Sequence, residues 1–360
     1  MLNDFSGSPK VLEGVLEGLM ESGMDVELFT SSGGVLDRLP PSPLLRRHPI
    51  GYTFNERNLP LSFLKFLYAN SRYFFRALGR KKESGSIFYI NTIMPFGAAL
   101  GAKLRGNRVV YHCHEYAYSK GVHYRLFSRI MEWVADDIIC VSAHQASSLK
   151  RRKGVRVIAN SLDPEFVERL KPDADKAFER RTVLMVCSLR SYKGIEEFAR
   201  LADRMPDVRF ELVANDTERT VAAFAARKEF SRIANLSFHP RTADVAEYYN
   251  RASVVVNLSN TQKFTETFGM TVIEAKAAGL PAIVPPRGGI ADLVEEGKNG
   301  YHIGVERLEE VRERLREMLD DRELYRRLSR EALADAKRFR RDEAIRAIRA
   351  VIEKNSLREG

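Results

Sequence analysis

The sequence predicts an α/β protein with two doubly wound parallel-sheet domains. Short apolar runs that end at turn residues alternate with segments of helical periodicity, which is typical of parallel sheets covered by helices on both faces. The alternation begins afresh near residue 182, after a polar stretch that contains Pro164 and Pro172. A chain of 360 residues is long enough for about two such domains.

The first half of the chain alternates strands and helices. Helices are predicted at residues 11–19, 96–104 and 124–134. Strands are predicted at residues 26–30, 86–91, 109–114, 137–142 and 155–159. Only Met1 and Leu2 precede a polar loop that contains Gly7, so a strand at the beginning of the chain is nearly absent. We therefore expect the first strand of the first domain to be truncated.

The second half repeats the pattern and ends in helices. Strands are predicted at residues 182–188, 208–213, 236–239, 254–258 and 281–284. Helices are predicted between them at residues 194–205, 221–230, 245–251 and 269–279. Apolar residues at helical spacing over 308–318 and 344–352 predict two more helices. The polar residues 163–181 are the predicted linker between the domains.

Composition narrows the class of protein. No run of about 18 apolar residues is present, so no membrane span is expected. The first residues lack the layout of a signal peptide, which predicts a cytoplasmic protein. Cys113, Cys140 and Cys187 lie in or beside apolar runs without metal-ligand spacing, which predicts buried free thiols. The net charge of +10 favours anionic partners without choosing among nucleic acid, lipid and phosphorylated glycans.

Two glutamates eight residues apart, Glu266 and Glu274, flank the sequence Phe268-Gly269-Met270. A helix that begins near Gly269 leaves its first amide groups without intrahelical partners, and such a helix start binds anions. Gly269 would let a ligand approach the backbone closely. One short segment therefore offers amides for a diphosphate and two carboxylates for hydroxyl groups, as a nucleotide sugar requires.

This segment resembles the donor-site motif of the retaining glycosyltransferases of family 4, which have the GT-B fold of two Rossmann-like domains. The family pattern is Glu, seven residues and Glu, with Phe-Gly after the first Glu. The resemblance continues through the Arg-Gly-Gly-Ile sequence at residues 287–290 and the glycines at 297 and 300. It implies that Glu266 holds donor-sugar hydroxyls and that Glu274 holds the ribose. It also implies that four residues present backbone amides to the donor: Phe268, Gly269, Met270 and Thr271.

The resemblance extends to four more positions. Arg190 and Lys193 follow the first strand of the second half, where the family has cations on the donor diphosphate, although the spacing is shorter here. Fixed cations would stabilise the departing diphosphate, and the alternative is a pair of solvated loop cations. His114 ends a strand where the family has a histidine that faces the donor sugar; His112 and a packed core histidine are the alternatives. Gly7 lies where the family has a glycine-rich loop.

The resemblance also implies the domain organisation and the reaction. Residues 1–165 would form the acceptor domain, residues 175–335 the donor domain, and residues 336–360 a helix that packs back on the first domain. A sugar would pass from a nucleotide-diphosphate donor to a hydroxyl of a glycan or lipid-linked acceptor, in bacterial surface polysaccharide synthesis. Retention would follow front-face attack without a covalent intermediate. No Asp-x-Asp motif stands out, and the cations can replace a divalent ion, so we expect no metal and no cofactor.

The sequence indicates the acceptor-binding residues less clearly than the donor-binding residues. Residues 57–82, which begin with Arg57 and end with Lys82, contain seven Lys or Arg, six Phe or Tyr and no acid. Four of the cations recur on one helical face: Lys65, Arg72, Arg76 and Arg80. The segment is either an amphipathic helix with a solvated basic stripe or a contact for anionic membrane lipid or a phosphorylated acceptor. No nucleic-acid recognition motif is present.

Two other functions remain open at the level of sequence. One is a related GT-B activity, such as a nucleotide-sugar epimerase or a phosphorylase. The other is a non-enzymatic GT-B scaffold that binds an anionic surface. The complete set of Glu266, Glu274, Arg190 and Lys193 argues against a decayed site, whereas the nearly absent first strand argues mildly for one.

Overall fold

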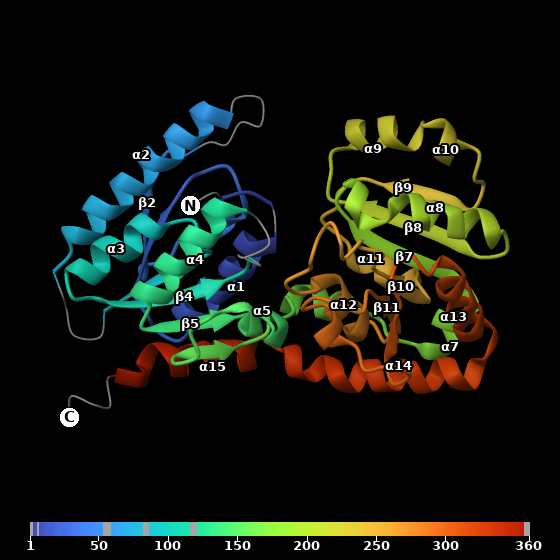
Figure 1. The fold of residues 1–360 in the computed structure, drawn as a ribbon. Coiled ribbons are helices and arrows are strands. Elements are labelled where there is room, and N and C mark those ends of the chain that lie inside the picture. Colours follow the sequence, from blue (N-terminus) through green and yellow to red (C-terminus); the bar gives the residue numbers. More distant parts are fainter. Residues whose placement is uncertain (1–2, 6, 53–58, 82–85, 116–120, 356–360) are drawn as a thin grey trace. The chain divides into compact units, whose positions relative to one another are not determined.

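The chain folds into two units, and each has parallel strands at its centre (Figure 1). This computed structural model describes residues 3–5, 7–52, 59–81, 86–115 and 121–355. Unit 1 comprises Met1–Ser161 and Arg341–Gly360, and unit 2 comprises Leu162–Arg340. None of the helices in the described part is long and apolar enough to cross a lipid bilayer.

The strands of unit 1 form two parallel sheets rather than one. β1 (Val26–Thr30) pairs with β2 (Leu45–Pro49) in a sheet of two strands. The second sheet contains four strands in chain order: β3 (Ile87–Asn91), β4 (Arg108–Cys113), β5 (Asp137–Cys140) and β6 (Val155–Val157). Within the described residues no strand connects the two sheets. The predicted first strand falls on Met1 and Leu2, which lie outside the described residues.

Asn3 fixes the beginning of the described chain beside β1. Its backbone amide donates to the Ser31 hydroxyl at 2.9 Å, and its side-chain oxygen accepts from the Leu36 amide at 3.0 Å. Leu36 belongs to a short 3₁₀ helix, Val35–Arg38, that the sequence did not predict. β2 was also missed, because two arginines, a histidine and a proline hide its strand character.

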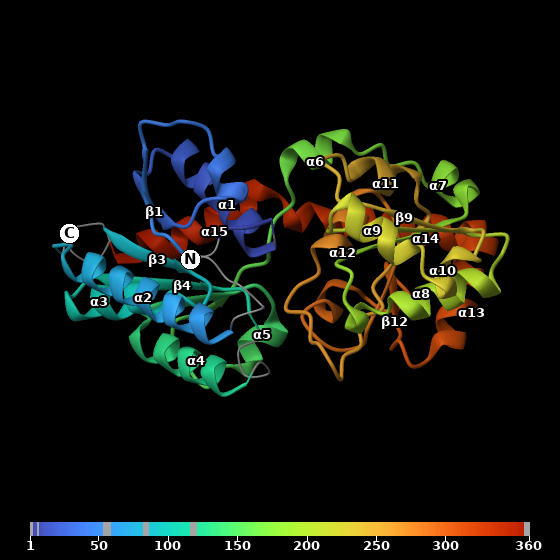
Figure 2. The same cartoon turned by 90° about the horizontal axis from the view of Figure 1, so that it is seen from above.

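Helices cover both faces of the four-stranded sheet (Figure 2). α2 (Leu59–Leu78), α3 (Phe96–Leu104) and α4 (Val122–Val134) pack on one face, against side chains such as Tyr111 and Ile138. α1 (Gly7–Glu21) and α15 (Arg341–Ile352) pack on the other, against Val110 and Ile139. Tyr111 and Val110 face opposite ways because successive residues of a strand do so.

The C-terminal helix α15 lies in unit 1. Ile345, Ile348 and Val351 are buried there in one cluster with Val15 and Leu19 of α1. The Arg341 guanidinium pairs with the Glu17 carboxylate at 3.0 Å, and the Arg108 guanidinium donates to the last carbonyls of α15. Residues distant in sequence thus share one apolar interface with polar contacts at its two ends.

Unit 2 contains one sheet of six parallel strands in the spatial order β12-β11-β10-β7-β8-β9. The strands are β7 (Thr182–Cys187), β8 (Arg209–Ala214), β9 (Leu236–His239), β10 (Val254–Val256), β11 (Ala282–Val284) and β12 (Gly300–His302). From β7 the sheet grows in one direction through β8 and β9, and from β10 it grows in the opposite direction through β11 and β12, so the strand order reverses between β7 and β10. Ligands of doubly wound sheets bind at the carboxyl ends of the strands beside such a reversal.

The helices of unit 2 surround this sheet in Figures 1 and 2. They are α8 (Ile195–Arg204), α9 (Glu218–Ala225), α10 (Lys228–Ser231), α11 (Ala246–Arg251), α12 (Met270–Ala277), α13 (Leu308–Asp320) and α14 (Arg322–Ala336). Nearly all predicted strands and helices are confirmed to within a few residues. The parallel sheets and the mixture of helix and strand confirm the predicted fold class.

Three predicted elements are wrong in detail. The linker at residues 163–181 is helical, with α6 (Pro164–Arg169) capped by Asp163 and α7 (Ala174–Arg180) capped by Asp173. The helix predicted at residues 221–230 is two helices, because Arg227 is extended between α9 and α10. α1 begins at Gly7 and not at residue 11. At residues 163–181 the aspartate caps decided where the two short helices begin.

The three cysteines are free, as predicted, and Cys113 and Cys140 are buried, whereas Cys187 is half-buried. Burial raises the pKa of the Cys140 and Cys187 thiols to about 12, so both remain protonated at neutral pH. A protonated thiol is neither a nucleophile nor a metal ligand. Both thiols are therefore packing groups.

Candidate functional site

Two of the predicted site residues of unit 2, Lys193 and Glu266, lie on loops that leave the two central strands. The short turn Ser191–Lys193 follows β7, and the segment that carries Glu266 follows β10. These are the two strands between which the strand order reverses. The sheet topology therefore brings Lys193 and Glu266 together although 73 positions separate them in the sequence.

Lys193 and Glu266 form an ion pair. Their side chains are only 14% and 15% exposed, so solvent screens the pair less than it would at the surface. The Ser259 hydroxyl donates to the same Glu266 oxygen at 3.1 Å. The Lys193 ammonium also lies 4.7 Å from the ring centroid of Phe264, which stacks on Tyr192. The ammonium and the carboxylate are therefore both fixed before any ligand arrives.

The backbone around Lys193 is held against the neighbouring loop. Gly194 has a positive φ of +78°, and a Cβ there would lie 2.3 Å from the Leu258 carbonyl oxygen. The Asn260 amide donates to the Tyr192 carbonyl at 2.8 Å. Only glycine permits this approach. Arg190, at the start of the same turn, has an exposed side chain.

A glycine pair fixes the backbone of Glu266 from the other side. The Gly289 amide donates to the Glu266 carbonyl at 2.7 Å. Gly288 has a φ of +101°, and a Cβ there would lie 2.8 Å from the same carbonyl oxygen. The Arg-Gly-Gly sequence after β11 thus supports the first glutamate of the pair. The sequence had shown only that these glycines match the family pattern.

Glu274 lies inside α12 and is held by a tyrosine from α11. The Tyr249 hydroxyl donates to the Glu274 carboxylate at 2.6 Å. Burial, followed by the charge of Glu274, holds the pKa of Tyr249 well above its ordinary value, so the hydroxyl stays a donor. The ring of Tyr249 is fully buried and meets Phe166 edge to face at 5.5 Å. The hydrogen bond from Tyr249 therefore fixes the orientation of the Glu274 carboxylate.

α12 begins where the sequence predicted, but Gly269 is required there for a different reason. Gly269 precedes the helix, and a Cβ there would lie 2.6 Å from a carbon of Ile290 and 3.2 Å from Leu293. Close packing against these side chains accounts for the glycine, whereas the sequence suggested ligand approach. Phe268 is buried and packs against Phe339.

The first amides of α12 remain suited to an anion. The intrahelical bonds begin with Val272 and Ile273, which both donate to the Gly269 carbonyl. Met270 and Thr271 therefore occupy the first turn, whose amides have no carbonyl partner one turn earlier within the helix. Both residues are half-buried, and Glu274 follows one turn later.

The two remaining predicted residues, His114 and Gly7, belong to unit 1. His114 follows β4, and its Nε2 lies 2.9 Å from the Asn91 side-chain oxygen at the end of β3. The Asn91 amide in turn donates to the Ser8 hydroxyl at 3.1 Å, in the first turn of α1. Gly7 begins that helix, and a Cβ there would meet open space. The carboxyl ends of β3 and β4 and the start of α1 thus form one polar cluster.

Both candidate histidines are neutral at physiological pH. Burial lowers the pKa of His114 to about 4. Burial, and then the proximity of His114, lowers the pKa of His112 well below its ordinary value. The two rings lie 4.2 Å apart between centroids, and His112 Nδ1 lies 2.6 Å from the Tyr89 hydroxyl. His112 is fully buried, whereas His114 is only partly buried, which favours His114 as the residue that meets a ligand.

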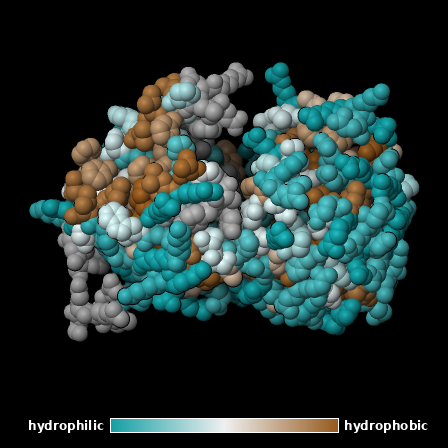
Figure 3. Space-filling view, in the orientation of Figure 1, coloured by the Kyte–Doolittle hydropathy of each residue, from teal (hydrophilic) through white to brown (hydrophobic). Residues whose placement is uncertain are grey.

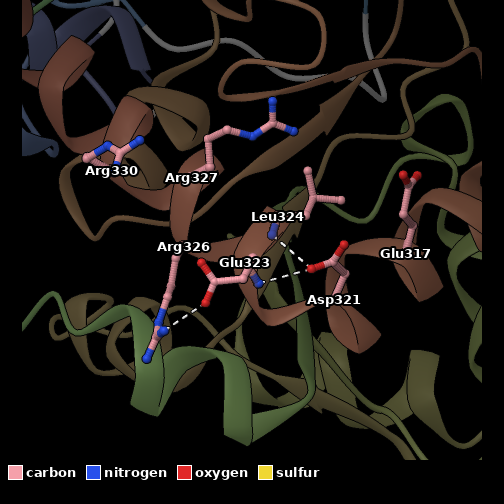
Figure 4. Close-up of a pocket in the computed structure, with 7 residues that line it drawn as sticks. All are labelled: Glu317, Asp321, Glu323, Leu324, Arg326, Arg327 and Arg330. Carbon is pink, nitrogen blue, oxygen red and sulfur yellow. Dashed lines mark hydrogen bonds and ion pairs between the residues drawn. The ribbon is translucent and has the colours of Figure 1, made fainter.

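A separate hollow of about 550 Å³ lies where α13 meets α14, and it contains none of the predicted site residues. Figure 4 shows its lining, in which Asp321 caps α14 and Glu323 pairs with Arg326. These charged groups serve the helices themselves, so we assign no function to the hollow. The described part of the chain contains no group of three His, Cys, Asp or Glu residues arranged to hold a metal ion.

Sequence reasoning missed several residues that support the site. Ser259 follows a strand of unit 2 and Asn91 ends a strand of unit 1, so the rule that ligands bind at strand ends could have identified both. Tyr249 gave no such signal. It lies on a helix, 25 positions before Glu274, and only the packing of α11 beside α12 brings the two together.

Comparison with known proteins identifies a family for each half of the chain. Residues 167–335 match the glycosyl transferases group 1, and residues 5–166 match glycosyltransferase family 4. An uncharacterized glycosyltransferase of Haemophilus influenzae is 24% identical over 335 residues, which are 90% of this chain and 89% of that protein. The alpha-monoglucosyldiacylglycerol synthase of Acholeplasma laidlawii is 30% identical over 146 residues, or 39% of this chain and 36% of that protein.

A solved structure shares the fold over nearly the whole length. HepE from Anabaena, solved in complex with UDP, superimposes with a TM-score of 0.76 at 18% identity and covers 98% of this chain and 99% of its own. The same protein was also solved with UDP-glucose. At this identity the likeness shows the fold alone.

Proposed function

This chain belongs to the glycosyltransferases of family 4 and has the GT-B fold, and from that premise we propose the reaction and the roles of its residues. The chain is a glycosyltransferase. We propose that it moves a sugar, with retention of configuration, from a nucleotide diphosphate to a hydroxyl of a glycan or lipid-linked acceptor. The observation that carries the proposal is the grouping of the Lys193–Glu266 and Tyr249–Glu274 pairs around the loops that leave β7 and β10 and the start of α12.

The diphosphate of the donor would bind at the first turn of α12. The amides of Met270 and Thr271, with those of Phe268 and Gly269 before them, offer donors to phosphate oxygens. Arg190 adds a cation from an exposed position in the loop after β7. Glu274 accepts hydrogen bonds from the ribose hydroxyls, with its direction set by Tyr249.

Glu266 would orient the donor sugar by accepting hydrogen bonds from its hydroxyls. Lys193 stays beside this carboxylate and offsets the negative charge that develops on the departing diphosphate. A cation that is already in place needs no reorganisation during the reaction, which is the physical basis for the proposal that neither a metal ion nor a resident cofactor is needed.

The bond changes in front-face transfer are simple. The bond between the anomeric carbon and the diphosphate oxygen breaks, and the acceptor oxygen bonds to the same face of that carbon. The proton of the acceptor hydroxyl passes to the leaving phosphate oxygen, so no enzyme carboxylate is consumed. His114, which is neutral, would hydrogen-bond to the sugar without adding charge. Gly7, at the start of α1, has open space where a Cβ would lie and would leave room for a ligand.

The partners follow from chemistry and from the relatives. The UDP and UDP-glucose complexes of HepE favour a uridine nucleotide as donor. The name of the Acholeplasma relative favours a lipid-linked acceptor. We propose a cytoplasmic role at the inner face of a bacterial membrane, in surface polysaccharide synthesis, and no role with nucleic acid.

Calorimetric titration with UDP, GDP, ADP and CDP in the presence of EDTA tests the donor site. We expect selective binding of one nucleotide, loss of that binding in Glu274→Ala, and unchanged binding in Glu247→Ala, a control on the exposed face of neighbouring α11. Absence of binding to all four nucleotides would contradict the donor site. Binding that returns only when a divalent ion replaces EDTA would contradict metal independence.

A further inference from the structure

The outward surface of α2 and α4 is unusually apolar for a protein surface. The described part of the chain has twelve exposed large hydrophobic side chains, and nine of them lie on these two helices. Those nine are Leu61, Phe63, Leu64, Leu67, Tyr68, Phe75, Val122, Leu126 and Trp133. Figure 3 shows apolar side chains gathered over α2. A cluster of this kind marks an interaction site in most soluble proteins.

These exposed side chains do not contribute to the hydrophobic core of unit 1. α2 already buries a stripe on its inner side, with Phe66, Ala69, Tyr73 and Ala77 at helical spacing. The outward side of an ordinary surface helix would be polar. Here Leu64, Tyr68 and Phe75 are each more than 60% exposed.

The two helices form one continuous surface. The rings of Phe63 on α2 and His123 on α4 lie 5.7 Å apart, and Phe66 meets Phe127 beneath them at 5.5 Å. On α4, Val122, Leu126 and Trp133 are spaced by four and seven residues, which places them on one side of the helix. Trp133 is 76% exposed and is the single tryptophan of the chain.

The charges of α2 and α4 are nearly all positive. The single acidic residue of the two helices is Glu132, near the end of α4, and its carboxylate accepts a hydrogen bond from the Arg151 amide at 2.7 Å. Five cations that accompany the apolar side chains are exposed or half-buried: Lys65, Arg72, Arg76, Arg125 and Arg129. Long basic side chains can lay their methylene groups on apolar surface and extend the charge outwards.

We propose that this surface, which we call the α2–α4 face, binds a membrane that contains anionic lipid. Apolar side chains enter the acyl boundary while Lys and Arg meet phosphate headgroups, as in interfacial amphipathic helices. A second copy of the chain is a poor partner, because a symmetric contact would bring cations against cations. The inference does not need an active donor site, but it would bring a lipid-linked acceptor to unit 1.

Trp133 gives a direct test with the intact chain. We expect its fluorescence to shift to the blue with vesicles of phosphatidylcholine and phosphatidylglycerol, and to stay unchanged with phosphatidylcholine alone. Added salt should reverse the shift. An unchanged spectrum with anionic vesicles, or an equal shift with neutral ones, would overturn the proposal.

Paired variants locate the contact by vesicle flotation. We expect Leu64→Ser combined with Phe75→Ser to lower binding at least ten-fold, whereas Val157→Ser, an exposed apolar residue of β6, leaves binding unchanged. Replacement of Arg72 and Arg129 by Gln should weaken binding to anionic vesicles alone. Equal binding by all variants would overturn the proposal, as would a dimer that the Leu64 and Phe75 changes dissociate without any vesicle binding by the parent chain. Unchanged circular dichroism and an unchanged urea unfolding midpoint would show that each variant is folded, without reference to nucleotide binding.

Discussion

At the scale of single residues, the site depends on groups that hold the two glutamates rather than on the glutamates alone. Tyr249 directs Glu274, while Lys193 and Ser259 hold Glu266. A carboxylate that is already oriented loses less conformational entropy when a sugar hydroxyl binds. We therefore count these supporting contacts as part of the candidate site, although they need not touch the ligand.

Replacement of Tyr249 by Phe tests the positioning of Glu274. Loss of the hydroxyl removes one hydrogen bond to the carboxylate but keeps the buried ring, so we expect nucleotide binding to weaken by about 1 kcal/mol, or roughly five-fold in Kd. Titration calorimetry with UDP measures the change. Tyr248→Phe, at the neighbouring position on the same helix, should leave the affinity unchanged. Equal effects of the two variants would show that Tyr249 does not act through Glu274.

The buried histidines predict how stability depends on pH. Their pKa values are lowered in the folded chain, to about 4 for His114, so the unfolded chain binds more protons below pH 6.5. The stabilisation is complete above pH 6.5 and is lost as the pH falls from there towards 4, by up to about 1.4 kcal/mol per pH unit for each histidine.

Urea unfolding between pH 7 and pH 5 measures this dependence. His114→Gln should flatten the decline of stability towards acid pH, whereas His123→Gln, at an exposed position on α4, should not. A decline that is equally steep in both variants would mean that His114 does not account for it.

At the scale of elements, close contacts between loops set the site. Gly194 lets the turn after β7 lie against Leu258 after β10, which places Lys193 beside Glu266. The same kind of contact joins Gly288 to Glu266 from the loop after β11. The loops therefore form a mutually supported set at the strand ends.

Gly194→Ala tests that contact. The new Cβ would combine backbone strain at positive φ with a clash against a carbonyl oxygen 2.3 Å away, and the strain alone costs roughly 1–3 kcal/mol. Gly297 is a matched control, because it has a φ of +67° and open space around its Cβ. We expect a larger loss of thermal stability and of UDP affinity for Gly194→Ala than for Gly297→Ala. Equal losses would mean that strain alone acts at residue 194.

At the scale of the whole molecule, the two units contain different candidate binding surfaces. Unit 2 carries the candidate donor site, with its six strands in the order that creates a strand reversal. Unit 1 carries the histidine cluster and the α2–α4 face, and it is completed by α15 from the other end of the chain. Because α15 buries Ile345, Ile348 and Val351 against α1, the terminal helix is part of the core of unit 1.

The sequence by itself determined most helices and strands, because the residue patterns that predict them are local in the chain. Apolar runs between turn residues located every strand of the four-stranded sheet and every strand of the six-stranded sheet except β12, and the Glu266 to Glu274 segment identified the family. The sequence also found the basic, aromatic character of residues 57–82, although Arg57 and Lys82 themselves lie outside the described residues. Its failures at residues 163–181 and 221–230 arose where short polar helices depend on capping and contacts rather than on periodicity.

Only the tertiary structure decided which residues meet. Lys193 and Glu266 pair because the strands before them, β7 and β10, are neighbours in the sheet although they are distant in sequence. Tyr249 reaches Glu274 because α11 lies near α12. The reason for Gly269, which is the contact with Ile290, and the joining of α4 to α2 in one face are equally non-local. Periodicity along a chain records the side of an element that is buried, and it carries no information about which other element covers that side.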